Sequence, residues 1–438
     1  MKNTLVPKEE QPYKIPSNWC WIRLENIAEW GSGGTPSRKR KEYYNGNIPW
    51  IKTGELNNGY IFNSEEKITE LGLKNSSAKL YPINTVIIAM YGATIGKVGI
   101  LSIEATTNQA CACAIVYKNI LFKYVFHYLI YQKEAFINKS KGGAQPNLSQ
   151  EIIKKHEIPL PPIKEQQRIV NRIESLFAKI DRAKELIENT LAQFEQNKMA
   201  ILHKAFTGEL TAKWRKEKGL SKDTWKRKKI SEVCTVVRGG SPRPAGSPQF
   251  YGGNIPFMKV ADITNNDTPY INSTASFIKE AGLYKTRMVE ANTLLLTNSG
   301  ATLGVPAICT FKTTFNDGIA AFLNLNPKSV KYYYYFFISK TAELRGINKG
   351  AAQPNLNTKI IGEIMHNVPT IEEQQEIVNI LDKLLAKYNK IKNLEQQLEK
   401  IELLKKAILA KAFRGELGTN NPDEESAENL LKEILAEK

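Results

Sequence analysis

Residues 141–148 have the sequence KGGAQPNL, and residues 349–356 repeat it as KGAAQPNL, 208 positions later, with seven of eight letters unchanged. The register continues downstream, where PLPPIKEQQRIVNRI (159–173) parallels NVPTIEEQQEIVNIL (367–381). Agreement of this length at a fixed spacing indicates an internal repeat. The chain is therefore expected to consist of two tandem copies of one unit.

Further motifs recur in the same order in both copies. They are GG[TS]P (33–36 and 239–242), NIP[WF] (47–50 and 254–257), GAT[IL]G (92–96 and 300–304) and AFxGEL (205–210 and 412–417). The match is close from the octapeptide to the GEL triplet and loose before it. This unevenness indicates that one part of the unit must stay constant while the other is free to differ.

Each copy contains a long amphipathic segment whose apolar residues recur at spacings of three and four. They are Ile169, Ile173, Leu176, Ile180, Ala183, Ile187, Leu191 and Phe194 in the first copy, and Ile377, Leu381, Leu384, Tyr388, Ile391, Leu394, Leu398, Ile401, Leu404 and Ile408 in the second. A proline precedes and a glycine follows each segment, as helix start and stop signals do. The pattern predicts two rods of roughly 60 Å that pair as an antiparallel coiled coil. The alternative is two separate helices in unrelated cores.

The loose part of each copy has a mixed pattern. Short β-like runs (85–91 and 292–298) alternate with glycine-rich turns, and an apolar helical pattern follows each (122–130 and 331–340). The aromatic residues of the second helix are expected in a core and not on a base-stacking platform. The predicted fold class is α+β: two globular α/β-type units related by internal duplication, separated by two long antiparallel coiled-coil helices with pseudo-twofold symmetry.

The composition favours a polyanionic partner. Lys and Arg exceed Asp and Glu by 17, and the pI is near 9.4, which suits nucleic acid first and an acidic membrane second. The alternative is that the excess charge only maintains solubility. The five cysteines and four histidines show no metal-binding or redox spacing, the first residues hold no apolar signal region, and the apolar runs are too short to span a bilayer. We expect a cytoplasmic, reduced, metal-free protein without membrane contact.

A duplicated chain with paired rods behaves like a dimer, and DNA-binding dimers contact two half-sites at a fixed spacing. Units that differ would recognise different half-sequences. Arginine pairs with guanine, and Asn or Gln with adenine, while most basic contacts go to phosphate. The candidates for DNA contact are Arg38, Lys39, Arg40, Lys41, Lys52, Asn108 and Gln109 in the first unit, and Arg238, Arg243, Lys259, Asn298 and Asn316 in the second. For each of them, an ordinary solvated surface position is the alternative.

The motifs above, in this order and repeated twice from about Pro16 to Leu417, resemble those of the DNA-specificity subunit of Type I restriction–modification systems. The resemblance implies two target-recognition domains and a helical spacer. It implies double-stranded DNA and two adenine-methyltransferase subunits as partners, with restriction subunits as possible additional ones. S-adenosylmethionine, ATP and Mg²⁺ would then be bound by those partner subunits and no cofactor by this chain. It further implies that the starts of the long helices contact the methyltransferase subunits, at Glu165, Gln166, Gln167, Glu373, Gln374 and Gln375.

The expected domains are 1–160 (first target-recognition domain), 161–212 (first spacer helix), 213–366 (second recognition domain, with a basic connector at 213–229), 367–418 (second spacer helix) and 419–438 (acidic tail). The connector is either a solvated linker or a phosphate contact. The tail, which departs from the family pattern, could cap the spacer, bind a partner or have no specific role.

Two other functions compete with DNA recognition. A coiled-coil scaffold could join protein partners without specific DNA contact. A self-contained methyltransferase would need an [ND]PP[YF] motif and a glycine-rich cofactor loop, and neither is present. GATIGKVG (92–99) is one residue short of a phosphate-binding loop and has Val98 where Ser or Thr should bind Mg²⁺. We therefore expect a non-catalytic chain.

Overall fold

The computed structural model describes residues 4–140, 147–266, 268–300, 302–347, 356–386 and 392–437. They divide into two compact units: unit 1, from Met1–Ile187 and Gln396–Lys438, and unit 2, from Glu188–Glu395. Most of the two octapeptides lies outside the described residues. Their last residues are described, and the amide nitrogen of Leu148 donates to the Met90 carbonyl oxygen at 2.9 Å, as that of Leu356 does to Asn298 at 2.8 Å.

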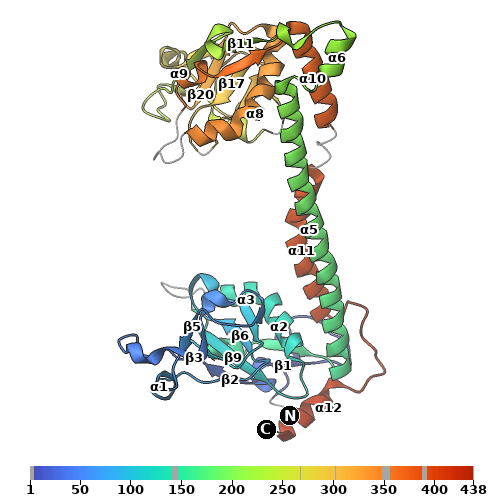
Figure 1. Ribbon diagram of the computed structural model, residues 1–438. Coiled ribbons are helices and arrows are strands. Elements are labelled where there is room, and N and C mark those ends of the chain that lie inside the picture. Colours follow the sequence, from blue (N-terminus) through green and yellow to red (C-terminus); the bar gives the residue numbers. More distant parts are fainter. Residues whose placement is uncertain are drawn as a thin grey trace. The chain divides into compact units, whose positions relative to one another are not determined.

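Unit 1 contains three sheets (Figure 1). Its strands are β1 (Cys20–Arg23), β2 (Ala28–Ser32), β3 (Tyr44–Ile51), β4 (Gly59–Ile61), β5 (Glu66–Ile68), β6 (Val86–Ala89), β7 (Val98–Leu101), β8 (Thr106–Thr107), β9 (Cys111–Val116) and β10 (Glu157–Leu160). The strand orders are β2-β9-β6-β7-β4, β5-β3-β8 and β1-β10. Its helices are α1 (Glu70–Lys74), α2 (Phe122–Tyr131), α3 (Lys133–Lys139), α4 (Gln150–Lys154) and α12 (Ala427–Glu437).

Unit 2 repeats this topology. Its strands are β11 (Lys226–Lys229), β12 (Thr235–Arg238), β13 (Tyr251–Met258), β14 (Tyr270–Ile271), β15 (Phe277–Ile278), β16 (Arg287–Val289), β17 (Thr293–Thr297), β18 (Pro306–Cys309), β19 (Thr313–Phe315), β20 (Ile319–Leu323) and β21 (Met365–Val368). The orders β12-β20-β17-β18-β14, β15-β13-β19-β16 and β11-β21 match those of unit 1, with β16 as an addition. Its helices are α6 (Ala212–Glu217), α7 (Val260–Thr264), α8 (Val330–Ile347), α9 (Thr358–Gly362) and α10 (Ile371–Ala386). The duplication predicted from the sequence is confirmed.

The central strands are buried on both faces. In β6, Val86 and Ile88 join the core beneath α2, while Ile87 and Ala89 face a second apolar cluster. A strand directs successive side chains to opposite faces, so a short continuous apolar run suits a strand that is covered on both sides. The aromatic residues of α8 are buried in the core of unit 2, as predicted.

The long helices form in both copies. Helix α5 runs from Ile163 to Thr207, 45 residues or about 68 Å. Its partner segments are α10 and α11 (Lys392–Phe413), and Tyr388 and Ile391 of the predicted seam lie outside the described residues. Within unit 1, the start of α5 bonds to Thr419 through Glu165, and Asp181, further along, bonds to Lys405. The partner residue number falls as the α5 number rises, so the pairing is antiparallel.

Two of the described seam residues, Ala183 and Leu404, are exposed. Leu404 is 50% exposed, whereas Ile401, Leu409 and Ala412 are buried. The spacing of three and four allowed Leu404 on either edge of the stripe, and packing placed it outside. In the part of the chain that the structure describes, no helix is both long enough and apolar enough to cross a bilayer.

Three buried histidines predict acid sensitivity. Burial lowers the pKa of His127 and His366 to about 4 and that of His156 to about 3. The unfolded chain binds protons below about pH 6.5, while these native histidines stay neutral, so stability is lost as the pH falls from 6.5 toward 4. We expect each to cost about 2 kcal/mol of unfolding free energy between pH 7.5 and pH 5. Urea unfolding of His366→Phe should show a smaller pH difference than the parent, and that of the exposed-site variant His203→Gln an equal one.

Candidate nucleic-acid interface

The same loop packs on the same turn in both units. In unit 1, the Gly34 amide donates to the Thr107 carbonyl oxygen at 2.8 Å, and a Cβ on Gly33 would lie 2.2 Å from that oxygen. In unit 2, the Gly240 amide donates to the Phe315 carbonyl oxygen at 3.1 Å, and a Cβ on Gly239 would lie 2.2 Å from the Asn316 oxygen. The GG[TS]P motif therefore recurs because only glycine permits this approach.

A hydroxyl group fixes each loop to the turn. Thr35 is hydrogen-bonded to the side-chain oxygen of Gln109, and Ser241 donates to Asp317 Oδ1 at 2.5 Å. In each turn the residue directly before Gln109 or Asp317 is an asparagine, Asn108 or Asn316. The two loops thus share one backbone frame with different side chains on it.

In unit 2 the loop and turn border a hollow of about 660 Å³. Three of the predicted DNA-contacting residues, Arg243, Lys259 and Asn316, line it together. Arg243 lies 3.8 Å from Asp317 and its side chain is 71% exposed, while Oδ1 of Asn316 has no hydrogen-bond partner within the described residues. Arg238 donates from Nε to the Asp317 carbonyl oxygen at 2.6 Å, beside the hollow. Guanidinium, ammonium and amide groups are those that contact bases and phosphates.

In unit 1 the corresponding basic residues are paired with acids. Arg38 bonds to Glu66 at 2.6 Å, and its guanidinium lies 4.5 Å from the centre of the Tyr44 ring. Lys52 bonds to both Glu65 and Glu66 at 3.0 Å. Hydrogen bonds from Arg38 and Lys52 hold the pKa of Glu66 below its usual value. The two loops therefore share a frame but differ in how their basic side chains are paired.

The other predicted DNA-contacting residues fall in different places. Arg40 is exposed and lies 3.5 Å from Glu42, and Lys39 and Lys41 are exposed on the same loop. Asn298 is 0% exposed. The expectation that its side chain contacts DNA is wrong for this conformation, because the residue sits in the core where its backbone bonds to Leu356.

The sequence did not single out two basic residues beside the hollow. Lys285 donates to the Arg243 carbonyl oxygen at 3.3 Å, and Arg287 donates to that of Arg238 at 3.0 Å. They come from η8 (Glu280–Lys285) and β16, which only the tertiary structure brings to the loop. Spacing along the chain carries no signal for them.

The predicted partner-binding residues are mostly buried within the chain. Glu165, Gln166, Glu373 and Gln374 are at most 2% exposed, and only Gln167 and Gln375 face outward. The four buried side chains are bonded internally and are not available to a partner in this conformation. Direct partner contact at Gln167 and Gln375 stays a prediction.

The buried glutamates form a joint in each unit. In unit 2, Glu373 accepts from Thr211 at 2.6 Å and from Trp225 at 2.9 Å, and pairs with Arg215. In unit 1, Glu165 accepts from Thr419 at 2.7 Å and from Arg168, and burial raises its pKa against these bonds. Each joint ties the start of one long helix to the segment after the GEL triplet of the other. Part of the basic connector is therefore structural, because Arg215 and Trp225 belong to this joint, while most of its lysines are exposed.

A family model described as the Type I restriction modification DNA specificity domain matches residues 16–192 and 222–403. The chain belongs to this family. It is 27% identical to the Type I restriction enzyme MjaIX specificity subunit of Methanocaldococcus jannaschii, over 94% of this chain and 96% of that one. It is 24% identical to the EcoKI specificity subunit of Escherichia coli, over 97% and 96% of the two chains.

Solved structures share the fold of this specificity subunit. A chain from a study of complex assembly and conformational transition of the Type I restriction–modification system matches with a TM-score of 0.73 at 21% identity, over 93% of this chain and 100% of that one. The HsdS subunit from Thermoanaerobacter tengcongensis matches with a TM-score of 0.58 at 21% identity, with the same coverage. The family carries DNA-recognition domains and is non-catalytic, so the self-contained methyltransferase alternative is excluded.

Proposed function

We propose that this specificity subunit recognises a bipartite, gapped and asymmetric DNA target, with one half-site for each recognition domain. The observation that carries the proposal is the shared loop-and-turn frame with different side chains on it. Arg243, Lys259 and Asn316 border an open hollow in one unit, whereas Arg38 and Lys52 are paired with glutamates in the other. Two loops with the same backbone arrangement and different contacting side chains are suited to two different half-sequences.

We further propose that the chain positions two adenine-methyltransferase subunits on this target, with a restriction subunit as an optional addition. S-adenosylmethionine, ATP and Mg²⁺ would be bound by those subunits. Exposed leucines on α11 support a protein partner: Leu403 is 63% and Leu404 50% exposed. Adjacent exposed apolar side chains on one helix are typical of surfaces that another protein covers.

A genome-wide map of methylated adenines, in cells with and without this gene, tests the function. We expect one gapped, two-part motif to lose methylation when the gene is removed. An unchanged map, with the partner genes expressed, would favour the alternative of a scaffold that does not recognise DNA.

The hollow of unit 2 makes a sharper prediction. Removing Arg243 with Arg243→Ala should weaken binding of the assembled complex to its target by about 1–3 kcal/mol if it contacts a base. If Lys259 contacts phosphate, Lys259→Ala should weaken binding to all sequences alike and reduce the salt dependence by about one ion. The control Lys359→Ala, which removes the same charge from an exposed site elsewhere in unit 2, should leave both quantities unchanged. Equal losses in all three variants would assign the effect to net charge alone.

A further inference from the structure

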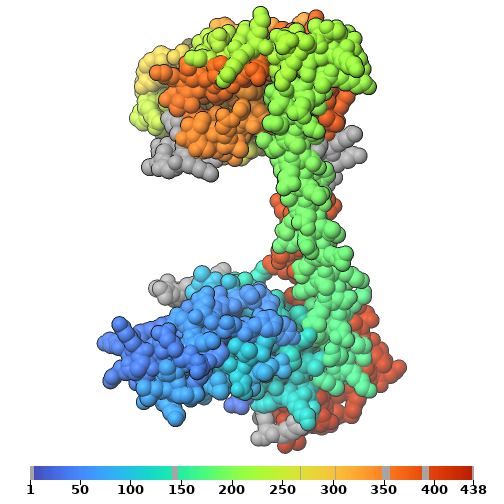
Figure 2. Space-filling model, viewed as in Figure 1, coloured from blue at the N-terminus to red at the C-terminus, as the bar shows by residue number. Residues whose placement is uncertain are grey.

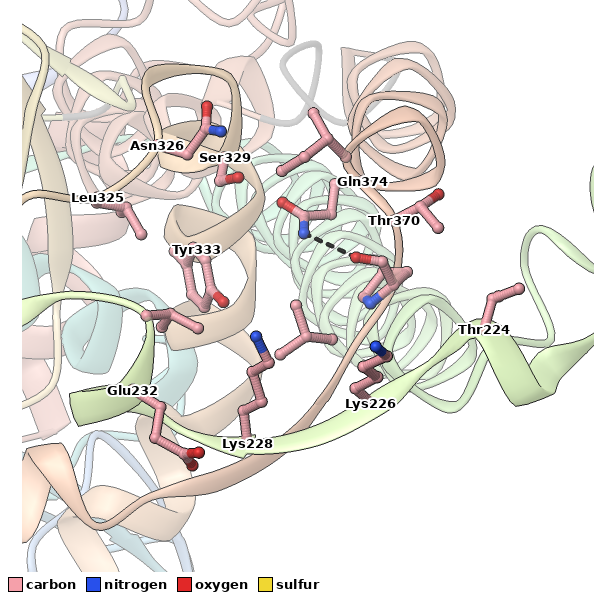
Figure 3. Close-up of a pocket in the computed structure, with 14 residues that line it drawn as sticks. Thr224, Lys226, Lys228, Glu232, Leu325, Asn326, Ser329, Tyr333, Thr370 and Gln374 are labelled. Atoms are coloured by element: carbon pink, nitrogen blue, oxygen red, sulfur yellow. Dashed lines mark hydrogen bonds between the residues drawn. The ribbon is translucent and has the colours of Figure 1, made fainter.

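A groove of about 370 Å³ opens on unit 2 between β11, β21 and the start of α8 (Figure 3). Val233, Leu325 and Ile371 supply apolar walls, and the side chains of Lys226 and Lys228 rise from β11 beside them. The size is near the lower end of ligand pockets, about 300–1,000 Å³.

The corresponding face of unit 1 is covered by α12. The Ala427 amide donates to the Asn18 carbonyl oxygen at 2.9 Å, and Asn119 donates to Glu433 at 3.4 Å. Leu431 and Ile434 are at most 1% exposed and belong to the core of unit 1. In Figure 2 the red surface of the C-terminal segment adjoins the base of α5. Of the three roles considered for the tail, capping is the one that these contacts favour.

The strand registers identify the two faces as equivalents. Cys20 pairs with Leu160 in unit 1, and Lys226 pairs with Val368, 208 positions after Leu160, in unit 2. Asn18, which holds α12, therefore corresponds to Thr224, a lining residue of the groove. The offset of 208 between Leu160 and Val368 also relates Asn119 to Pro327, which lies between the groove residues Asn326 and Ser329.

A buried amide on the wall of the groove is bonded differently in the two units. Gln166 and Gln374 occupy the same place in the two copies, and each donates from Nε2 to a proline carbonyl oxygen at 3.0 Å. Oε1 of Gln166 accepts from the Leu121 amide at 3.0 Å. Oε1 of Gln374, a residue 2% exposed that lines the groove, has no hydrogen-bond partner among the described residues. A buried acceptor of this kind normally has a donor.

We propose that this groove is the docking site for an acidic amphipathic helix of a partner subunit, seated as α12 is seated on unit 1. The apolar walls suit the apolar stripe of such a helix. Lys226 and Lys228 outnumber the one lining carboxylate, that of Glu232, and suit the acidic face of the helix. This inference depends on the proposed function in one respect, namely that the chain has a partner subunit.

The test uses a fluorescent peptide with the sequence of residues 426–437, SAENLLKEILAE, titrated into the full chain and followed by anisotropy. We expect saturable binding of one peptide per chain, weakened about tenfold or more by Lys228→Glu, since charge reversal at an interface rim opposes an acidic ligand. The matched control is Arg227→Glu on the opposite face of β11, which should change the affinity less than about twofold. A scrambled peptide without the apolar stripe should not bind.

Two results would overturn the proposal. Absence of binding, or binding that Lys228→Glu leaves unchanged, would show that the groove does not take such a helix. Concentration-dependent self-association of the full chain that Lys228→Glu abolishes would assign the groove to a second copy of this chain instead. The assay measures peptide binding without DNA. A negative peptide result therefore does not contradict the proposed DNA recognition, and an unchanged methylation map does not contradict peptide binding.

Discussion

Arg215→Ala should destabilise unit 2 by about 3–5 kcal/mol, because removal of one partner leaves a buried charge uncompensated. The Arg215 side chain is 8% exposed and that of Glu373 is 0% exposed, so water cannot replace the lost guanidinium. Hydrogen exchange measured peptide by peptide should show loss of protection in α6, β11 and α10 and little change in unit 1.

The control for this prediction is Arg227→Ala, which removes an exposed arginine from the same connector. It should leave exchange unchanged. The double variant Arg215→Met with Glu373→Gln should recover much of the stability, because the buried pair is then replaced by groups without charge. Equal loss in the single and double variants would mean that packing around Arg215, and not its charge, stabilises the joint.

Exchange of residues 16–140 for the equivalent segment of a relative should change one half of the DNA target and leave the other intact. The segment lies within unit 1 and carries the loop, the turn and the Arg38–Glu66–Lys52 cluster. Each mismatched base pair typically costs about 1–3 kcal/mol, so methylation of the old half-sequence should fall to background. Maps of methylated adenines from cells with the parent and hybrid chains measure this.

The reciprocal exchange within unit 2, over residues 222–347, is the matched control and should change the other half alone. A hybrid that changes both halves at once would contradict separate recognition by the two units. Loss of all methylation would be interpreted only after circular dichroism had shown that the hybrid chain folds.

The sequence by itself determined the duplication, the strand cores and the long helices. These features depend on local periodicity: alternate residues of β6 face two cores, and residues three and four apart on α5 face one stripe. The paired GG[TS]P motifs also marked equivalent loops of the two units, where only glycine allows the backbone to meet the turn.

Only the tertiary structure decided which polar side chains are accessible. Nothing in the sequence distinguishes Asn298 and Glu373 from exposed residues of the same types, yet both are 0% exposed. Lys285 and Arg287 bond to the carbonyl oxygens of Arg243 and Arg238, which lie far from them in the chain. The sequence also did not predict that α12 covers one face of unit 1 while the equivalent face of unit 2 carries an open groove. Burial depends on long-range packing that local periodicity does not encode.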